Sequence, residues 1–483
     1  MAADQMLWDF QSYSDRPALI CDHGETITYK DLLTLGCELA DIDQGRPRPL
    51  VMMLCRNTPG ALYGYGALQS SGYPLLMISA EIPAQLQRQV MNQYRPAMIF
   101  VPEKLRGEYA HLQTIRTVRD YLLLKTNYPS GYPVDPRLCQ LLTTSGSTGS
   151  VKYVRQSRTN VMFNASAIAD YLGLTQEDRS ITSLPLQYTY SLSMLHAAFL
   201  RGAATVVTSY GLLDNEFWDL MEDQEVTLFH GVPNTYEIMY KMEMFSEDFP
   251  ALKTLTQAGG KLNRELHAFV ADYARTQGKK FIVMYGQSEA TAAITWLPAE
   301  KSFEKAGSVG IVIPGGTVSL QSEDGNTVTA PHVQGEIVYF GDNVSMGYAL
   351  GGEDLNKGDE RGGLLRTGDL GEFDEDGFLY IVGRLKRVIK ISGHRISLDE
   401  IDENILKELN IFCVSSGTDD HLVIFVTSES DRDAVNAWIR KDIHVVRNCF
   451  ETAVIAEFPK NESGKILYGK LQDMAESIIS EGK

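Results

Sequence analysis

Paired cysteines, leader-like segments and membrane-length apolar runs are missing from this sequence. Its 483 residues include six cysteines, at positions 21, 37, 55, 139, 413 and 449, and no two lie close together. Such spacing is typical of reduced thiols and not of a disulfide framework or a zinc site. The start, MAADQMLWDFQSYSD, has no basic patch followed by an apolar core. No apolar run approaches a membrane span, so we expect a cytoplasmic protein without a membrane partner.

Positive charge is also in short supply. The chain has 44 basic and 62 acidic residues, a net charge of −18. This deficit argues against nucleic acid as the main partner, although it allows a local basic pocket for a nucleotide. The length predicts two or three domains, and nothing in the sequence indicates an oligomeric state.

Apolar β-branched runs alternate with amphipathic stretches over the first three hundred residues. Strands are predicted at 50–55, 96–102, 203–209, 226–231 and 279–286, and helices at 58–72, 80–94, 217–225 and 264–278. This alternation favours parallel sheets covered by helices. Beyond about residue 300, Gly, Val and turn residues predict antiparallel strands.

A basic stretch, GRLKRVIKISGHRISLDEID, begins at Gly383 and separates two regions with different sequence patterns. The residues after it predict a small α+β unit, with a helix at 396–409, a strand at 421–427 and a helix at 430–442. We therefore predict an N-terminal domain over 1–383, a hinge at 384–386 and a C-terminal domain over 387–483.

The segment TTSGSTGSVK (143–152) is either a surface linker or a phosphate-binding loop. Its glycines let backbone amides approach an anion, and its hydroxyls add donors. Lys152 does not directly follow Gly149, so the spacing is not that of the Walker loop. A predicted strand at 138–144 and a helix at 159–173, with Thr159 as the expected cap, place the segment inside a domain and favour the phosphate loop.

Five further elements follow it in an order that resembles the adenylate-forming ligase superfamily, which includes acyl-CoA synthetases, adenylation domains and beetle luciferases. They are QAGGKL (257–262), MYGQSEAT (284–291), GEIVYFGDNVSMGY (335–348), the run LRTGDLGEF to GHRIS (365–397) and PKNESGK (459–465). Val151 replaces the usual proline, and the first 140 residues match only loosely, through ITYKDLL (27–33). The resemblance implies an α/β fold in which a large domain of helix-covered parallel sheets carries a small β-barrel-like part. It also implies a small, mobile α+β C-terminal domain.

The resemblance further implies a reaction and its residues. A carboxylic acid would react with ATP to give an acyl-adenylate and pyrophosphate, and the acyl group would then pass to a thiol. Lys465 is similar to the lysine that bridges carboxylate and α-phosphate, and Glu289 to the Mg²⁺ ligand. Rotation at Lys386 would exchange Lys465 for a face that carries Lys390. The other residues implied in ATP binding are Thr144, Ser145, Gly146, Ser147, Thr148, Gly149, Lys152, Gly259, Gly260, Tyr285, Gly286, Ser288, Asp369 and Arg384.

Without the resemblance, each of these residues has a plainer interpretation, such as a solvated lysine, a surface glutamate, core packing or a turn. The resemblance implies that Tyr285 stacks on adenine and that Asp369 takes the ribose hydroxyls. Tyr468 stands where the family has an arginine.

The substrate pocket is assigned to Tyr188, Thr189, Tyr190, His230 and Met284, of which His230 and Met284 could equally be core residues. Thr189 falls where amino-acid-activating relatives carry an aspartate, and a buried ammonium without a carboxylate is costly. A small non-amino carboxylic acid is therefore the expected substrate. Coenzyme A is the expected acceptor, and a carrier-protein phosphopantetheine or an amine is the alternative.

Two rival hypotheses stay open at this stage. GQSEA (286–290) approaches the Gly-x-Ser-x-Gly element of serine hydrolases, but ends in alanine. A catalytically silent nucleotide-binding relative is the other rival, against which the presence of Lys465, Glu289 and Asp369 argues.

Overall fold

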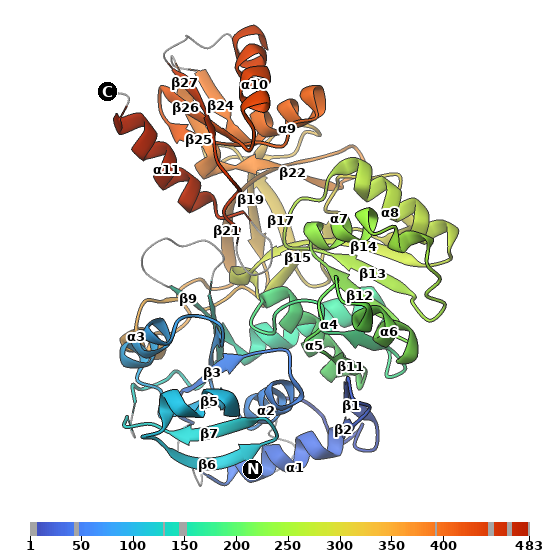
Figure 1. Cartoon of the computed structure of the whole chain (residues 1–483), viewed down its shortest axis with the longest axis vertical. Helices are drawn as coiled ribbons and strands as arrows, with labels where there is room; N and C mark the ends of the chain where they lie inside the picture. Colours follow the sequence, from blue (N-terminus) through green and yellow to red (C-terminus); the bar gives the residue numbers. More distant parts are fainter. Residues whose placement is uncertain are drawn as a thin grey trace. The chain divides into compact units, whose positions relative to one another are not determined.

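The structure, a computed structural model, describes residues 7–42, 48–128, 131–143, 152–391, 394–442, 449–460 and 466–481 (Figure 1). These residues form two compact units. The first comprises the described residues up to Thr317 together with Phe340–Leu365. The second comprises Val318–Tyr339 and the described residues from Arg366 onward. The hinge predicted at 384–386 stays a prediction.

The first unit contains two large sheets, and the strand order of one is β16-β15-β14-β13-β12-β10-β11-β1-β2. Its strands are β1 Pro17–Cys21, β2 Thr26–Thr28, β10 Arg179–Ile181, β11 Ala204–Val207, β12 Leu228–Gly231, β13 Thr254–Gln257, β14 Lys280–Gln287, β15 Ala292–Trp296 and β16 Ile311–Val312. The strands from β1 to β14 in this order pair in parallel, whereas β2, β15 and β16 are antiparallel. Parallel strands with almost wholly buried residues require cover on both faces.

The other large sheet has the order β20-β9-β8-β4-β3-β5-β7-β6. Its strands are β3 Val51–Cys55, β4 Leu75–Ser79, β5 Met98–Pro102, β6 Gln113–Val118, β7 Tyr121–Lys125, β8 Leu138–Thr143, β9 Tyr153–Ser157 and β20 Gly347–Ala349. The central strands β8, β4, β3 and β5 are parallel. At one edge, antiparallel pairing of β9 with β20 brings residues near 153 beside residues near 348.

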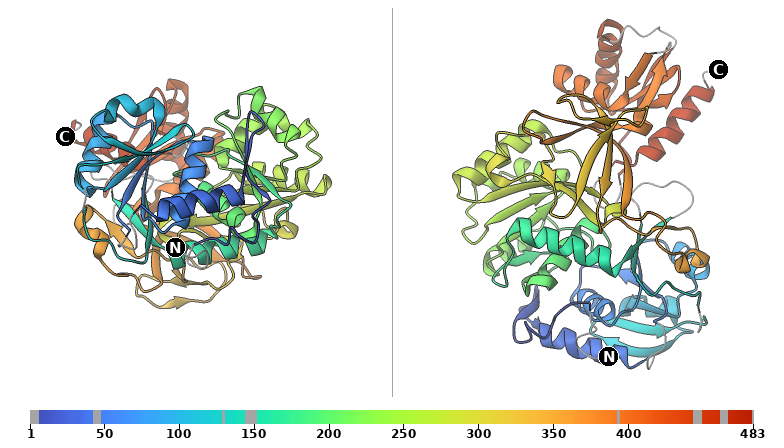
Figure 2. Two further views of the ribbon diagram at one scale, coloured as in Figure 1. Left: turned by 90° about the horizontal axis from the view of Figure 1, so that it is seen from below. Right: turned by 180° about the vertical axis from the view of Figure 1, so that it is seen from behind.

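Helices cover these sheets, as the views in Figure 2 show. They are α1 Tyr29–Ala40, α2 Pro59–Ser70, α3 Ala84–Tyr94, α4 Arg158–Leu172, α5 Thr189–Arg201, α6 Asn215–Asp223, α7 Pro233–Lys241 and α8 Arg264–Thr276. One core joins both sheets through helices; it includes Leu19, Val207, Met53, Leu142, Leu35, Tyr65 and Phe199. The sequence expectation of helix-covered parallel sheets is therefore confirmed for this unit.

The N-cap of helix α4 lies two residues before the expected one. Its cap is Ser157, whose hydroxyl accepts from the Asn160 backbone N–H at 3.1 Å, while Asn160 Oδ1 accepts from the Ser157 N–H at 2.8 Å. Thr159 was the wrong choice because a reciprocal capping box satisfies two free donors, whereas a lone threonine satisfies one. Asn160 also donates to the Asp342 and Val344 carbonyls, so the cap ties α4 to the segment before β20.

The second unit contains most of a five-stranded sheet and a small α+β part. Its elements are β17 Thr317–Gln321, β18 Thr327–Val328, β19 Gly335–Phe340, β21 Leu364–Phe373, β22 Leu379–Arg384, β23 Val388–Ile391, β24 His394–Ser397, α9 Leu398–Leu409, β25 Val414–Thr418, β26 His421–Val426, α10 Glu429–Asp442, β27 Phe450–Val454 and α11 Tyr468–Glu481. Helices α9 and α10 pack on β26 through Ile405, Ile424 and Ile439. Leu471 of α11 packs on Val414 and Phe425 in another apolar cluster. The predicted α+β unit is present.

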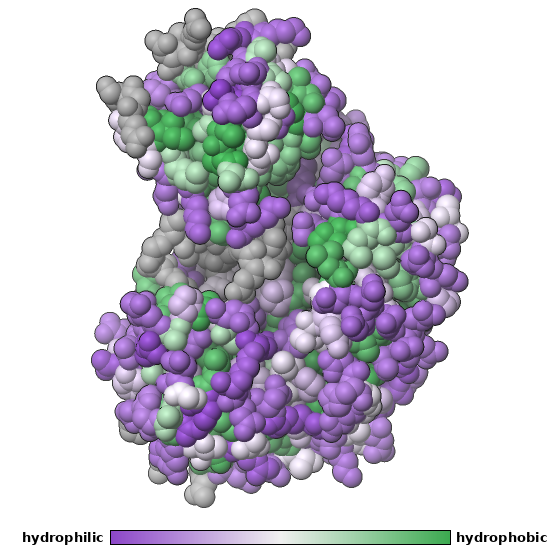
Figure 3. Space-filling model, viewed as in Figure 1, coloured by the Kyte–Doolittle hydropathy of each residue, from purple (hydrophilic) through white to green (hydrophobic). Residues whose placement is uncertain are grey.

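Polar residues dominate the face of the molecule in Figure 3, where green hydrophobic residues form separate groups among purple hydrophilic ones. Among the helices of the described chain, none combines the length and apolar character needed to cross a bilayer.

Candidate active site

A tight turn after β14 carries the central residues of the site. Strand β14 ends at Gln287, Ser288–Ala290 form a short 3-10 turn, and β15 begins at Ala292. Thr291 and Ala292 have φ angles of 52° and 116°, a region that non-glycine residues rarely adopt. A Cβ on Gly286 would overlap the Ala292 carbonyl oxygen, so only glycine fits there. Strain of this kind persists where surrounding contacts fix it, often at functional sites.

Two buried asparagines supply those contacts. The Asn343 side-chain amide donates to the Ala290 and Ala293 carbonyls at 2.7 Å each, and the Asn343 backbone carbonyl accepts from the Thr291 hydroxyl at 2.7 Å. Asn164 Oδ1 accepts from the Ala293 N–H at 3.0 Å. Because the polar groups on both sides of the turn are paired, its shape is determined by the core rather than by solvent.

Glu289 stands on this turn and is oriented by Tyr348. The Tyr348 hydroxyl donates to Glu289 Oε1 at 2.7 Å, and the Ser345 N–H donates to the Glu289 carbonyl at 2.8 Å. Burial, with the negative charge of Glu289 beside it, raises the pKa of Tyr348 to about 12, so the hydroxyl remains a donor at neutral pH. Among the described residues, Glu289 Oε2 has no hydrogen-bond partner. One half-buried carboxylate with a free oxygen suits Mg²⁺, which binds proteins through one or two carboxylates.

Positive charge converges on the same tyrosine. The pairing of β9 with β20 sets Tyr348 opposite Val154, two residues after Lys152. Lys152 Nζ lies 4.0 Å from the centroid of the Tyr348 ring, and Arg361 Cζ lies 4.8 Å from it. Of the predicted site residues, Lys152 and Glu289 are thus brought to one tyrosine. Tyr348 lies in the recognised 335–348 element but was not singled out, and Arg361 has no sequence motif to identify it.

Ser288 is held by two side chains. Its hydroxyl pairs with the Thr189 hydroxyl at 2.7 Å, and its carbonyl accepts from the Gln156 amide at 2.8 Å. No described histidine hydrogen-bonds this serine, so the arrangement of nucleophile and base that a serine hydrolase needs is not present there. Thr189 and Ser288, predicted from separate motifs, do meet.

Aromatic residues from α4, α5 and the first sheet pack together beside this turn. The Tyr188 hydroxyl lies where a Cβ on Gly259 would be, and Gly259 has a φ of 85°. The Tyr190 hydroxyl pairs with Thr256 Oγ1 at 2.7 Å. Met284 Sδ accepts from the Tyr171 hydroxyl at 2.8 Å, and Tyr171 stacks on Trp296 with 5.0 Å between ring centroids. Aromatic rings and the Met284 thioether therefore surround this part of the site.

His230 lies in the core below Tyr190, with 5.8 Å between the two ring centroids. Among the described residues, neither of its ring nitrogens has a hydrogen-bond partner. The ring lines a cavity of about 10 Å³ with Asn57 and Thr182, roughly the space that one water molecule needs. Burial lowers the pKa of His230 to about 4, so the imidazole is neutral at physiological pH.

The remaining predicted residues of the first unit lie on β14 or just after β13. Tyr285 is half-buried on β14 and pairs with Thr295 of β15. The Gln257 amide donates to the Gly260 carbonyl at 2.9 Å and so holds the Gly259–Gly260 pair. Residues 144–149 and Lys465 lie outside the described residues.

In the second unit, two predicted ATP-binding residues pair across adjacent strands. Asp369 of β21 lies opposite Arg384 of β22, and Arg384 Nε is 3.1 Å from Asp369 Oδ1. Lys386 and Lys390 are exposed, and the Lys390 N–H donates to Asp419 at 2.8 Å.

Just after Lys386, the buried Arg387 is the centre of an ion-pair cluster. Its guanidinium donates to Asp399 at 2.5 Å and to Asp402 at 2.7 Å. The guanidinium carbon lies 4.3 Å from the centroid of the Tyr468 ring. Tyr468, at the family's arginine position, therefore packs on an arginine from elsewhere in the same unit.

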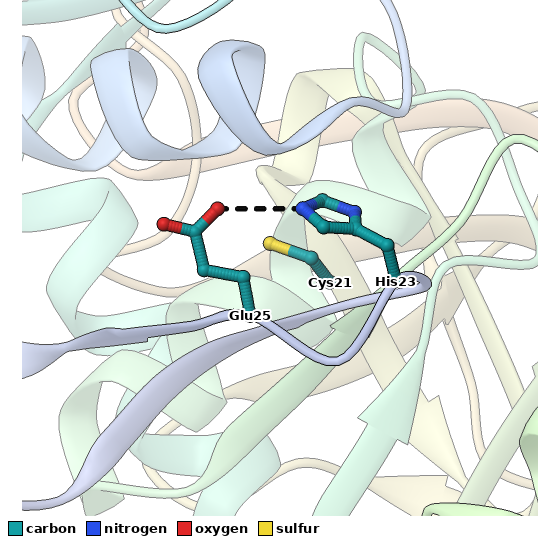
Figure 4. A group of neighbouring side chains, drawn as sticks. All are labelled: Cys21, His23 and Glu25. Carbon is teal, nitrogen blue, oxygen red and sulfur yellow. Dashed lines mark hydrogen bonds and ion pairs between the residues drawn. The ribbon is translucent and has the colours of Figure 1, made fainter.

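A possible metal cluster occurs in the β1–β2 hairpin, where the ligand atoms of Cys21, His23 and Glu25 lie within 4.8 Å of one another (Figure 4). Glu25 already accepts from Arg119 at 2.7 Å. Burial raises the pKa of Cys21 to about 11, which disfavours the thiolate that binds metals. Ion pairing accounts for this cluster without a metal.

Comparison with known proteins extends these observations over the whole chain. The model of the family described as AMP-binding enzyme matches residues 7–349. A feruloyl-CoA synthase from an Amycolatopsis species is 26% identical, over 93% of this chain and 94% of its own length. The 2-succinylbenzoate–CoA ligase of Bacillus subtilis is 24% identical, over 98% and 99% of the two chains.

Solved structures give the same result for the fold. An o-succinylbenzoate CoA synthetase from Bacillus subtilis, in complex with its acyl-adenylate intermediate, matches with a TM-score of 0.77 at 22% identity, over 97% of this chain and 98% of its own. An ATP-bound MatB from Rhodopseudomonas palustris gives a TM-score of 0.78 at 18% identity, with 98% and 99% covered. The predicted α/β fold class is confirmed. Since the family model spans most of the chain, and the motifs follow in the family's order, this protein belongs to the AMP-binding enzyme family.

Proposed function

We propose that this protein is an AMP-forming ligase that activates a carboxylic acid with ATP and transfers the acyl group to coenzyme A. The observation that carries this proposal is the arrangement of Glu289, Tyr348 and Lys152, in which a carboxylate and a cation, neither in an ion pair among the described residues, contact the same tyrosine. A carboxylate that holds Mg²⁺ and a cation that faces phosphate are what a bound triphosphate requires. The CoA ligases among the relatives support the acceptor.

The chain's own residues suggest how the first step would proceed. Glu289 would hold Mg²⁺, which supplies charge neutralisation at the phosphates when it is bound. Lys152 would bind the phosphates that leave as pyrophosphate. Lys465 would bridge the carboxylate and the α-phosphate, because two anions react only when positive charge lies between them. Asp369 would take the ribose hydroxyls.

The acid is proposed to be aromatic and without an α-amino group. Tyr188, Tyr190 and Met284 belong to one apolar cluster, and the Thr189 hydroxyl pairs with that of Ser288. An ammonium there would meet no carboxylate from Thr189 and would be costly to bury. Feruloyl-CoA synthase and 4-coumarate–CoA ligase, whose names specify aromatic acids, are among the relatives.

A screen of carboxylic acids tests this function. Each acid is incubated with enzyme, Mg²⁺ and ATP, the acyl-adenylate is trapped with hydroxylamine, and pyrophosphate is measured. The series is repeated with coenzyme A to detect a thioester. We expect acid-dependent pyrophosphate release that is greatest with aryl and aryl-alkenyl acids. Absence of release with every acid would support a silent nucleotide-binding relative, and adenylate without thioester would favour a carrier protein or an amine as acceptor.

A further inference from the structure

Two cations without carboxylate partners share one aromatic ring in the first unit. Lys152 Nζ and Arg361 Cζ lie 4.0 and 4.8 Å from the centroid of the Tyr348 ring. Among the described residues, no carboxylate lies within ion-pair distance of either cation. Two like charges beside one ring repel each other, and an anion or solvent next to them lowers that repulsion. Both cations lie at the ring whose hydroxyl binds Glu289, and such a combination of charges suits a metal-bound anion.

A turn closed by backbone hydrogen bonds places Arg361 at this ring. Asp359 Oδ1 accepts from the backbone N–H groups of Arg361 at 2.9 Å and Gly362 at 3.1 Å, which closes a turn at the arginine. Gly362 and Gly363 follow with φ angles of 57° and 80°, which turn the chain away at once. The Asp359 carboxylate thus accepts from backbone N–H groups and does not form an ion pair with the Arg361 guanidinium among the described residues.

A fully buried arginine anchors the same segment to the strand that carries Tyr348. Arg155 donates to the Tyr348 carbonyl at 3.0 Å, to the Met346 carbonyl at 3.1 Å and to the Gly358 carbonyl at 3.2 Å. It also pairs with Glu360 at 2.5 Å. A Cβ on Gly347 would crowd both partners of that pair. Because Glu360 is taken by Arg155, the acidic neighbour that could neutralise Arg361 is already committed.

We infer that Arg361 binds the triphosphate of ATP together with Lys152, and that Tyr348 positions both cations relative to Glu289. This inference rests on the proposed function and adds Arg361 to it. The ligand class is a magnesium-bound polyphosphate. Arg361 suits it because a guanidinium stacks on an aromatic face and still presents planar donors to phosphate oxygens. The tyrosine ring supplies a surface that a cation can cover without forming an ion pair.

Binding measurements on the whole protein test the inference. Calorimetric titrations with Mg·ATP, with magnesium and inorganic tripolyphosphate, and with adenosine are carried out on the wild type, Arg361→Gln and Arg361→Lys. Arg275→Gln is the matched control, because this exposed arginine of α8 likewise lies over an aromatic ring, that of Phe303, and pairs with Asp272 of its own helix. Thermal unfolding of each variant checks the fold.

We expect Arg361→Gln to weaken binding of Mg·ATP and tripolyphosphate about tenfold or more, the loss typical of one charge-assisted hydrogen bond. Adenosine binding should not change. Arg361→Lys should recover part of the loss, since its charge remains while the planar fork is lost. Unchanged polyphosphate binding by Arg361→Gln overturns the inference, and so does an equal loss for adenosine, which would indicate a structural role. If the wild type binds neither ATP nor tripolyphosphate, the proposed function fails instead.

Discussion

The Tyr348 hydroxyl donates to Glu289 Oε1 at 2.7 Å and leaves Oε2 of that carboxylate available. Strand β20, at the edge of one large sheet, thereby orients the carboxylate on a turn of the other large sheet. A side chain that fixes a metal ligand in this way typically affects metal affinity about tenfold or more when removed.

Tyr348→Phe is therefore expected to raise the Mg²⁺ concentration needed for half-maximal pyrophosphate release about tenfold. The phenyl ring keeps the surface under Lys152 and Arg361, so binding of metal-free ATP should change little. Tyr240→Phe, at an exposed tyrosine of α7, serves as the control. An unaltered Mg²⁺ requirement would show that the hydrogen bond does not position Glu289.

A chain of buried amides leads from the core to Ser288. The Gln140 amide donates to Gln156 Oε1 at 2.7 Å, and Gln156 donates to the Ser288 carbonyl at 2.8 Å. Gln156→Leu leaves the Gln140 donor and the Ser288 carbonyl without partners, which costs about 1–3 kcal/mol of unfolding free energy. Urea unfolding measures that loss, and the rate of adenylate formation should fall as the turn loosens. Equal stability of variant and wild type would mean that water replaces the amide without loss.

Much of the fold was predictable because burial leaves a clear pattern. The strands at 96–102 and 226–231 were predicted from apolar runs, and β5 and β12 lie within them. Amphipathic spacing likewise predicted the helix at 264–278, where α8 lies. Errors occurred where two residue types could serve the same local purpose, as with Ser157 and Thr159 at the start of α4.

The site was predictable only where a motif stands out in sequence. Glu289 and Lys152 belong to such motifs, whereas Arg361 lies in a turn of ordinary composition, KGDERGG. Its importance comes from the β9–β20 pairing and from Arg155, which together bring residues about two hundred positions apart into contact. Tertiary pairing of that kind has no periodicity along the chain, so a single sequence does not reveal it.

The raised pKa of the Asp402 carboxyl predicts that the stability of the second unit depends on pH. Burial raises the pKa of this carboxyl to about 7, although Arg387 acts in the opposite direction. A carboxyl whose pKa is raised on folding stabilises the folded state most below its unfolded pKa, and this contribution is lost as pH rises through the folded value. We expect wild type to lose about 2–3 kcal/mol of stability relative to Asp402→Asn between about pH 5 and pH 8.

Denaturant unfolding of both proteins at several pH values measures this difference. Asp402→Asn keeps the size of the side chain and its acceptor for the Ser415 N–H but removes the titration. An advantage of wild type that grows with pH would contradict the prediction, because it would mean that Arg387 holds the pKa of Asp402 below its usual range.

Lys465→Ala separates the two half-reactions. If Lys465 bridges carboxylate and α-phosphate, its loss should nearly abolish formation of the acyl-adenylate, because no other group would balance two reacting anions. Thioester formation from a supplied acyl-adenylate should be largely spared, since that step would use a different face of the C-terminal unit, with Lys390. Lys460→Ala, five residues earlier in PKNESGK, is the matched control for a change of charge in the same segment. Rates of both half-reactions are measured by rapid quench. Equal loss of the two would refute alternation of the C-terminal unit, because a residue withdrawn before thiol transfer cannot slow that step.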